Sequence, residues 1–377
     1  MRFSGNTWSR HGRTGAALLA LGAGVLLVAC KHNSNTTVTK GLWVANGANV
    51  VEFIPSQFTG GVVNVAPHLA NNSGTLGAPQ GVTFDSAGNL WVMDPNATVN
   101  GVKDTPALVK FTAAQLAALA ATPDPVPVAV ITSTSLNFPQ QSVFDAAGNQ
   151  WVTDHNNNTV LVFTAAQLMA TGINATVPAV VISSAAFNGP LGIVFDSMGN
   201  LWVANNGGVP GVGNAAPSAN GTTIVEFAKA SLPTPGSGML TPDLNPSITL
   251  SDNGAGSIQA PWELQFDSAG NLWSSNAAAP FSLVEFAKAN LTASAAPTPM
   301  TTISPTTDMG NPSLDNTNGL CFDNLGDIAA TNAADAFGIP FYKAPLKSGA
   351  ITPSTFIIGS NTTLEAPAGC NFGPLVK

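Results

Sequence analysis

Short apolar runs separated by polar turns recur along the chain, and residues 78–132 show the pattern completely. An apolar run over residues 78–85 leads into the turn 86–89, where Gly and Asn suit the positive φ of a hairpin. Further apolar runs follow over residues 90–94, 107–111 and 126–132, with a helical turn predicted at 112–116. Four short strands followed by a fresh copy of the same pattern indicate one blade of a β-propeller.

One phrase, an aromatic residue, an acid, a tight turn and then tryptophan, marks each new copy. The copies lie at residues 84–91, 144–151, 195–202, 266–273 and, in degenerate form, 322–329. A period of about fifty residues predicts stacked supersecondary units.

The two ends of the chain hold the parts of a sixth copy. Residues 41–46 form a second strand without a first strand before it, and residues 366–372 form a first strand with no second strand after it. Pairing of these segments would close a ring and remove the last free sheet edge. We therefore predict an all-β fold, a six-bladed β-propeller over residues 41–377, closed by pairing of the C-terminal strand with the N-terminal blade.

The repeated tryptophan has two interpretations. Tryptophan can stack on carbohydrate, but one aromatic side chain at a fixed strand position in each blade favours packing between adjacent blades. The degenerate copy carries Ala329 at this position. We expect either a gap there or compensating bulk from the neighbouring blade.

The N-terminal segment has the features of a targeting sequence. Basic residues precede an apolar run that ends Leu27-Val28-Ala29-Cys30, and this run is too short to span a bilayer. The ending resembles the bacterial lipobox, which implies removal of residues 1–29, lipidation of Cys30 and a flexible tether over residues 31–40. The alternative is an ordinary secretory peptide. Lys31, rather than Asp, follows the cysteine, and in the lipoproteins that this ending resembles such a residue favours the outer membrane. We therefore expect lipid anchoring in the bacterial cell envelope, at the outer membrane or cell surface.

Charge narrows the range of partners. Only 8% of the residues are charged, and all three arginines lie within the first thirteen residues. Nine lysines (12 − 3) then face twenty acids beyond Cys30, a net charge of −11. Such a surface repels phosphate backbones, so we expect no nucleic-acid partner. We expect the protein to be monomeric.

Two cysteines remain after Cys30, namely Cys321 and Cys370. Aligned on the repeat, they point to opposite faces of their strands, in neighbouring repeats rather than in paired strands. An oxidising compartment allows a disulfide, but this placement favours two buried free thiols.

The strand-turn-strand phrase resembles NHL-repeat propellers and the wider six-bladed group that contains gluconolactonase-type enzymes and streptogramin lyases. Residues 147–154 (AGNQWVTD) resemble the corresponding phrase of the lyases. The resemblance covers residues 41–377 and implies that any ligand site lies where the second-strand ends converge at the mouth of the central channel.

Polar residues end the second strand of every copy. They are Asn46, Asp94, Asp154, Asn205, Asn276 and Asn332. Asn and Asp also begin Asx-turns, so a purely structural role is an alternative. His155 follows Asp154, and Glu263 occupies a first-strand position where the other copies have Gly or Gln. Carboxylate, imidazole and amide ligands suit Ca²⁺ or Mg²⁺.

These residues leave three classes of function open. We expect a binding or interaction module for a protein, peptide or glycan. The alternative is a metal-dependent lyase or lactone hydrolase, in which Asp94, Asp154, Asn205 and Glu263 would hold the ion, with His155 as base and His155 and Glu263 as catalytic residues. A structural surface protein is the third class. Gluconolactonase-type enzymes carry a metal-binding Glu directly before the proline that opens a first strand. The residues at this position here are Ala78, Phe138, Gly189 and Ala260, so the resemblance does not extend to that ligand.

Overall fold

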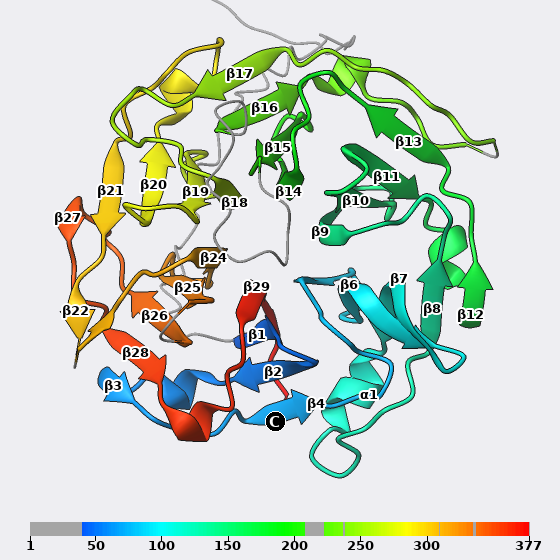
Figure 1. Ribbon diagram of the computed structural model, residues 1–377, viewed down its shortest axis with the longest axis horizontal. Coiled ribbons are helices and arrows are strands. Elements are labelled where there is room, and N and C mark those ends of the chain that lie inside the picture. Colours follow the sequence, from blue (N-terminus) through cyan, green and yellow to red (C-terminus); the bar gives the residue numbers. More distant parts are fainter. Residues whose placement is uncertain (1–39, 208–221, 237, 309, 335–336, 377) are drawn as a thin grey trace, which may run out of the picture. The chain divides into compact units, whose positions relative to one another are not determined.

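Six antiparallel sheets surround a central axis in the computed structural model (Figure 1). The structure describes residues 40–207, 222–236, 238–308, 310–334 and 337–376. The predicted leader, Cys30 and nearly all of the tether lie outside these residues. Within the described part of the chain, no helix is long and apolar enough to cross a bilayer.

The blades follow the predicted repeats, and each contains four strands in order from the innermost to the outermost. Blade 1 contains β29 (Pro367–Pro374), β1 (Lys40–Asn46), β2 (Asn49–Phe53) and β4 (Leu69–Asn71). Blade 2 contains β5 (Gly81–Phe84), β6 (Leu90–Val99), β7 (Val102–Phe111) and β8 (Ala129–Thr132). Blade 3 contains β9 (Pro139–Phe144), β10 (Gln150–Asp154), β11 (Thr159–Phe163) and β13 (Val180–Ser183).

The second half of the ring repeats this order. Blade 4 contains β14 (Pro190–Phe195), β15 (Leu201–Asn205), β16 (Thr223–Phe227) and β17 (Ile248–Ser251). Blade 5 contains β18 (Pro261–Phe266), β19 (Leu272–Asn276), β20 (Ser282–Phe286) and β21 (Thr301–Ser304). Blade 6 contains β24 (Thr317–Phe322), β25 (Ile328–Asn332), β26 (Gly338–Tyr342) and β28 (Thr355–Ile358). Helix α1 (Ala113–Ala117) and a small hairpin of β22 (Thr307–Asp308) and β23 (Asn311–Pro312) lie in connections.

The predicted closure of the ring is confirmed. Strand β29 pairs antiparallel with β1, from Lys40 opposite Pro374 to Asn46 opposite Pro367. The indole nitrogen of Trp43 also donates to the carbonyl oxygen of Pro374 at 3.2 Å. The first and last described strands thus share one sheet, and blade 1 has no free inner edge.

The acid of the repeated phrase holds the hairpin together. In blade 3, one carboxylate oxygen of Asp145 accepts the backbone N–H groups of Ala147 and Asn149, both at 2.9 Å. The other oxygen accepts the Asn149 amide at 2.8 Å and the Trp151 indole at 3.0 Å. Asp85, Asp196 and Asp267 make the same four kinds of bond. Because a charged acceptor strengthens these bonds, the phrase encodes a structural unit.

The five repeated tryptophans are core residues, as predicted, and their exposed fractions are 0 to 3%. Each one meets the first-strand phenylalanine of the next blade edge-on, with ring centroids 5.4 to 6.3 Å apart. The pairs are Trp43–Phe84, Trp91–Phe144, Trp151–Phe195, Trp202–Phe266 and Trp273–Phe322. Five of the six blade junctions therefore share one aromatic contact.

The sixth junction, between blades 6 and 1, is built differently. Phe341 lies opposite Ala329 in the sheet, and Phe58 from blade 1 stacks on Phe341 at 4.9 Å between ring centroids. Compensating bulk was therefore a correct expectation. In this sheet Tyr342, one residue after Phe341, occupies the position that Phe286 has in blade 5, because Ile328 pairs with Tyr342 as Leu272 pairs with Phe286. This one-residue shift turns Phe341 toward the position left empty by alanine.

The same junction holds a disulfide between Cys321 of β24 and Cys370 of β29, so the expectation of free thiols was wrong. The two cysteines do point to opposite faces of their strands, because Cys321 pairs with Ala329 and Cys370 with Val44. In a propeller, however, one face of each blade packs on the opposite face of the next. Opposite orientation therefore brings residues of neighbouring blades together, although it separates residues of a single sheet.

Segments between third and fourth strands form a second link around the ring. Strands β3 (Gly61–Val63), β12 (Gly172–Ala175) and β27 (Gly349–Ala350) pair in parallel with β28, β8 and β21 of the preceding blade. Bridges from Leu240, Asp243 and Ala295, and a bond from Asn72 to the carbonyl of Pro123, make the corresponding links at the other junctions. The outermost strands of blades 2 to 6 are thus paired with the following blade, and a single hydrogen bond links blade 2 to the end of the outermost strand of blade 1.

The antiparallel order gives the ring two distinct faces. The turns between first and second strands lie on one side, which we call the turn face, and the connections from third to fourth strands begin and end there. The loops between second and third strands and the connections into the next blade lie on the other side, which we call the mouth face. Lys40 begins β1 at the turn face, since β1 is a second strand.

Glu52 makes the stability of the closure depend on pH. Its side chain is buried on β2, where one carboxyl oxygen accepts the backbone N–H of Val376 at 3.3 Å and the other has no partner among the described residues. Burial raises the pKa of Glu52 from 4.5 to about 7. The carboxyl of Glu52 ionises above pH 4.5 in the unfolded chain but only above about pH 7 in the folded ring. The free energy of unfolding therefore falls as the pH rises through this range.

We expect Glu52→Gln to remove most of this pH dependence. At pH 8 the free energy of unfolding of the variant should exceed that of wild type by about 2 kcal/mol, with no difference at pH 4. Urea denaturation across this pH range measures the effect, with the exposed residue Glu365, changed to Gln, as the matched control. An unchanged difference between Glu52→Gln and wild type from pH 4 to pH 8 would contradict the expectation.

Candidate binding site at the inner ring

The innermost strands bring six pairs of residues to one level of the ring. The pairs are Ala368–Gly369, Gln80–Gly81, Gln140–Gln141, Leu191–Gly192, Trp262–Glu263 and Asn318–Gly319. Four of the second members are glycines because the next strand approaches closely. A Cβ on Gly319, for example, would lie 2.7 Å from the carbonyl oxygen of Ala368. Gln141 and Glu263 are the only residues with a side chain at this second position of the six inner strands.

Hydroxyl side chains of the second strands form hydrogen bonds between neighbouring blades at this level. Thr153 accepts the N–H of Gln141 at 3.1 Å and donates to the carbonyl oxygen of Leu191 at 2.6 Å. Ser275 accepts the N–H of Glu263 and donates to Asn318, and Thr331 bridges Gly319 and Ala368. The backbone of the inner ring is therefore held in a fixed geometry, as a binding site requires.

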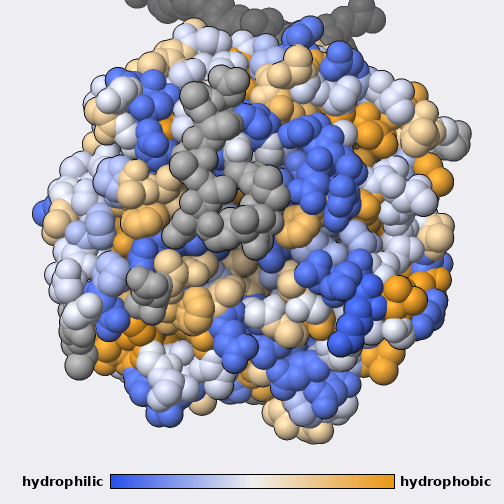
Figure 2. Space-filling model, in the orientation of Figure 1, coloured by the Kyte–Doolittle hydropathy of each residue, from blue (hydrophilic) through white to orange (hydrophobic). Residues whose placement is uncertain are grey.

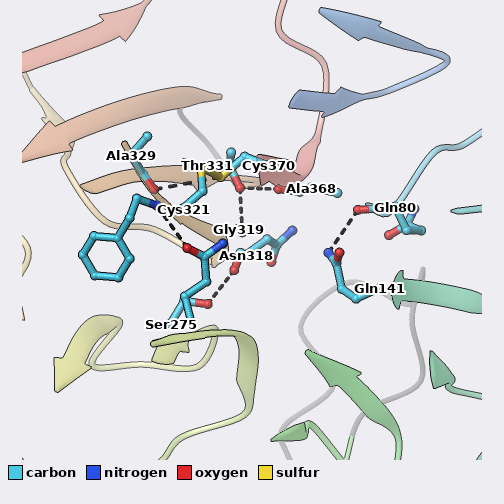
Figure 3. The surroundings of a disulfide bond; sticks show 12 residues. Gln80, Gln141, Ser275, Asn318, Gly319, Cys321, Ala329, Thr331, Ala368 and Cys370 are labelled. Carbon is cyan, nitrogen blue, oxygen red and sulfur yellow. Dashed lines mark hydrogen bonds between the residues drawn. A yellow bond between two sulfur atoms is a disulfide. The ribbon is translucent and has the colours of Figure 1, made fainter. Parts of the chain in front are cut away.

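Gln141 reaches across blade boundaries. Its amide nitrogen lies 3.5 Å from the carbonyl oxygen of Gln80, and a Cβ on Gly369 would collide with the same amide. Figure 3 shows Gln141 pointing from β9 toward Gln80, with Asn318 of β24 across from this pair. The side chain from blade 3 thus lies beside the inner strands of blades 2 and 1.

Glu263 is the titratable group of this ring. It is 6% exposed on β18, and one of its carboxyl oxygens has no partner among the described residues. Burial raises the pKa of Glu263 well above 4.5, and the N–H of Leu264 lowers it only in part. The environment therefore favours the protonated acid, which can donate a hydrogen bond.

Further buried polar atoms at this level lack partners within the described residues. They are both amide atoms of Gln140, the indole nitrogen of Trp262 and the amide oxygen of Asn318. Together with Gln141 and Glu263, we call these side chains the inner-ring polar residues. Each unpartnered group costs about 1–3 kcal/mol in a folded protein, and such groups normally pair with water or a ligand.

The residues that end the second strands are used differently. Asp94 accepts the backbone N–H groups of Gly77, Ala78 and Asn96 at 2.7 to 3.0 Å, and Asp154 accepts those of Asn137, Phe138 and Asn157 at 2.6 to 3.4 Å. Asn46, Asn205, Asn276 and Asn332 accept the N–H groups of Glu365, Asn188, Gln259 and Asp315. Each one ties the connection before the inner strand to its own blade, as the structural alternative requires.

The predicted metal ligands are not brought together. Asp94 and Asp154 belong to separate blades and direct their oxygens at backbone N–H groups, while Asn205 uses its amide on Ala186 and Thr223. No group of three or more His, Cys, Asp and Glu side chains suited to a metal occurs among the described residues. Burial raises the pKa of Asp94 and of Asp154 despite their N–H partners.

His155 lies where blades 3 and 4 meet. Its backbone N–H donates to the carbonyl oxygen of Phe138 at 3.1 Å. Its imidazole ring covers Gly189, where a Cβ would lie 3.1 Å from Nδ1. The imidazole is 4% exposed. Glu263, the other predicted catalytic residue, belongs to blade 5, so the two come from different blades.

Sequence comparison of the copies identified Glu263 but overlooked Gln140, Trp262 and Asn318. These residues directly precede the glycine position. The six copies carry five residue types there, namely Gln80, Gln140, Leu191, Trp262, Asn318 and Ala368. Three amides and an indole at one level of a channel would have been the signal. Figure 2 shows that hydrophilic side chains also gather on the viewed side over β6, β7, β10 and β11.

Comparison with known proteins supports the architecture. No protein-family model and no curated protein matches the chain. A protein of unknown function from Bacteroides caccae is 8% identical and has a TM-score of 0.54, over 89% of this chain and 100% of that one. A functionally unknown protein from Desulfotomaculum acetoxidans is 9% identical and has a TM-score of 0.50, over 89% and 99%.

Virginiamycin B lyase from Staphylococcus aureus is 12% identical and has a TM-score of 0.39, over 71% of this chain and 70% of the lyase. A streptogramin B lyase is 12% identical and has a TM-score of 0.41, over 78% of this chain and 87% of that one. At these identities the likeness concerns the fold alone.

Proposed function

We propose that the propeller is a lipid-anchored, extracytoplasmic binding module that receives a neutral glycan at the inner ring. The observation that carries the proposal is the set of buried, unpartnered hydrogen-bonding groups on Gln140, Trp262, Glu263 and Asn318. Native proteins rarely leave such groups unpaired. A ligand that supplied the missing partners would remove their cost.

The chemistry of these groups favours hydroxyl-bearing ligands without charge. Amides offer both donors and acceptors, the indole offers a donor beside an apolar ring, and a protonated carboxyl can donate. No Lys or Arg belongs to the inner-ring pairs, so anionic ligands lack the ion pairs that recognise them. Trp262 is partly exposed, and its ring can stack on a sugar.

A binding role predicts that the unpartnered groups are kept at the expense of stability. We expect Gln140→Leu and Glu263→Leu to raise the free energy of unfolding by about 1 kcal/mol each, because an apolar side chain needs no partner. Both variants should lose glycan binding at least tenfold. Glu263→Gln should keep it, since the amide replaces a protonated carboxyl as donor. Urea denaturation measures the free energy of unfolding. A glycan array identifies the oligosaccharides that bind the wild-type protein, and calorimetric titration with these oligosaccharides measures the affinity of each variant.

The matched control is Met198→Leu on the turn face, which should change neither quantity. If Gln140→Leu and Glu263→Leu destabilise the protein and no glycan is retained, the inner ring has a structural role and the proposal is wrong.

The alternative of a metal-dependent lyase or lactone hydrolase has its support in the sequence resemblance of residues 147–154 to the lyases and in His155. Calorimetric titration with Ca²⁺, Mg²⁺, Mn²⁺ and Zn²⁺ tests it. A site of micromolar affinity that Glu263→Gln abolishes would favour that alternative over glycan binding.

A further inference from the structure

The hairpin turn between β24 and β25 of blade 6 departs from the repeated phrase at two positions. In blades 2 to 5 an Asn lies four residues after the turn acid and a Trp six residues after it. In blade 6 the turn acid is Asp323, and these two positions carry Asp327 and Ala329. Both side-chain donors that the repeat provides for the turn acid are therefore absent, and a second carboxyl group replaces one of them.

The first carboxyl oxygen of Asp323 is used as in the other blades. Oδ1 accepts the backbone N–H groups of Leu325 at 2.7 Å and of Asp327 at 3.0 Å. The turn acids of blades 2 to 5 accept the corresponding N–H groups. Oδ2 of Asp323 therefore lies where the other blades place the oxygen that accepts the Asn and Trp side chains. Asp323 is 7% exposed, and its Oδ2 is buried without a partner among the described residues.

Asp327 is fixed in the same way as the Asn that it replaces. Its Oδ1 accepts the N–H of Ala344 at 2.8 Å, as Oδ1 of Asn271 in blade 5 accepts the N–H of Lys288 at 3.0 Å. The other polar atom of Asn271 is an amide nitrogen, which donates to Asp267 at 3.0 Å. Asp327 has an acceptor, Oδ2, at that place. The two carboxyl groups of blade 6 therefore direct one oxygen each toward the other.

No lysine relieves this contact within the part of the chain that the structure describes. Asp85 of blade 2 pairs with Lys110 at 3.8 Å, but neither Asp323 nor Asp327 has such an ion pair. Burial raises the pKa of Asp323, the N–H groups of its turn oppose this effect, and the nearby charge of Asp327 adds to it. Two ionised carboxyl groups at this place repel each other, and a cation between them would replace the repulsion with attraction.

The turn of blade 6 is also open to solvent. A Cβ on Gly326 would meet no neighbouring group within 4 Å, whereas a Cβ on Gly270 of blade 5 would lie 3.2 Å from the stem of Lys288. Blade 6 has Ala344 at the position of this lysine. An ion and its water ligands therefore have room to approach the two carboxyl groups.

We propose that the hairpin turn of blade 6 binds a calcium ion between Oδ2 of Asp323 and Oδ2 of Asp327, with water completing the coordination. Ca²⁺ takes carboxylate and water ligands in irregular arrangements, whereas Mg²⁺ requires a near-ideal octahedron. Two oxygens whose positions are fixed by backbone hydrogen bonds suit the more tolerant ion. The ion supplies the positive charge that the Asn amide and the Trp indole hydrogens supply in blades 2 to 5.

This site is separate from the inner ring and does not depend on glycan binding. Asn318 of the inner ring lies near the start of β24, and the turn follows the end of this strand at Phe322. The turn belongs to the junction with blade 1, where Cys321 forms the disulfide and the Trp–Phe contact of the other junctions is missing. Calcium therefore holds the hairpin at the junction that closes the ring.

Thermal unfolding and calorimetric titration with CaCl₂ test the proposal. We expect one site with a dissociation constant of about 0.1–1 mM, in the range of extracellular calcium modules. Calcium at 10 mM should raise the melting temperature above that in EDTA by about 2–4 °C. Asp327→Asn gives blade 6 the residue of the other hairpins. This variant should melt above wild type in EDTA, because the amide donates to Asp323, and should bind calcium at least tenfold more weakly.

Two variants are the matched controls. Asp124→Asn removes an exposed acid elsewhere on the ring, and Glu263→Gln removes the acid of the inner ring. Both should keep the wild-type response to calcium. An absent response in wild type, or an equal response in Asp327→Asn, would overturn the proposal. So would stabilisation of wild type relative to Asp327→Asn at pH 5 without any effect of calcium, since the two carboxyl groups would then share a proton instead of an ion.

Discussion

A chain that lacks residues 367–377 is expected not to fold. The deletion removes β29, and with it the innermost strand of blade 1, the ladder with β1, and Cys370 and Phe372 from the junction with blade 6. The bond from Gly369 to Gln80 of blade 2 is lost as well. The combined loss exceeds the 5–15 kcal/mol that typically separates folded from unfolded protein. Circular dichroism during heating should show no cooperative transition.

A permuted chain is the sharpest control for this deletion. Lys40 and Pro374 are partners in the sheet, so residues 365–376 can be joined ahead of Lys40 through a short turn. The permuted chain should melt cooperatively, near the wild-type temperature. A truncated protein that keeps the wild-type melting temperature would contradict closure of the ring by β29.

Reduction of the Cys321–Cys370 disulfide is expected to cost about 4 kcal/mol. The two cysteines are 49 residues apart, and a loop of that size restricts the unfolded chain by about this amount. The junction that the disulfide joins is the one without a Trp–Phe contact, so less packing remains after reduction. Urea denaturation with and without dithiothreitol measures the difference.

The double variant Cys321→Ala with Cys370→Ala is the control, because dithiothreitol should have no effect on it. Two reactive thiols in denatured, unreduced wild-type protein would contradict this prediction. So would unchanged stability of wild type under reducing conditions.

The sequence predicted those parts of the fold that repeat. Hairpin turns, tryptophan positions and the split sixth copy followed from spacing, because each blade meets the same geometric demands. The covering segments around the outside did not follow from the sequence. Strands such as β3 and β27 have three and two residues, which is too short for a period to show. Their pairing depends on where the preceding blade ends.

The disulfide and the register of the third strand of blade 6 could not be predicted from the repeat, because both lie where the chain departs from it at Ala329. The alternation of side chains between two faces tells which residues meet within one sheet. The two cysteines belong to different sheets, so the rule does not apply to them. Phe341 and Tyr342 are adjacent aromatics, so the sequence could not show which one faces the inside of the blade. The register does so, by pairing Ile328 with Tyr342.

The candidate site shows a similar limit. Asp94 and Asp154 stood out in the sequence because they are charged, yet their oxygens are occupied by nearby backbone N–H groups. Gln140 and Asn318 carry no charge and did not stand out. Their significance lies in what surrounds them, which is a three-dimensional property.

The pairing of outermost strands with the following blade has a consequence for evolution and engineering. A fragment of two or three blades would expose an uncovered outer edge at its last blade and an unmatched aromatic at one end. Such fragments should associate edge to edge instead of remaining soluble. Gain or loss of a single blade would therefore require the remaining blades to form a new complete circle at once, and stepwise shortening of this protein should meet a sharp barrier.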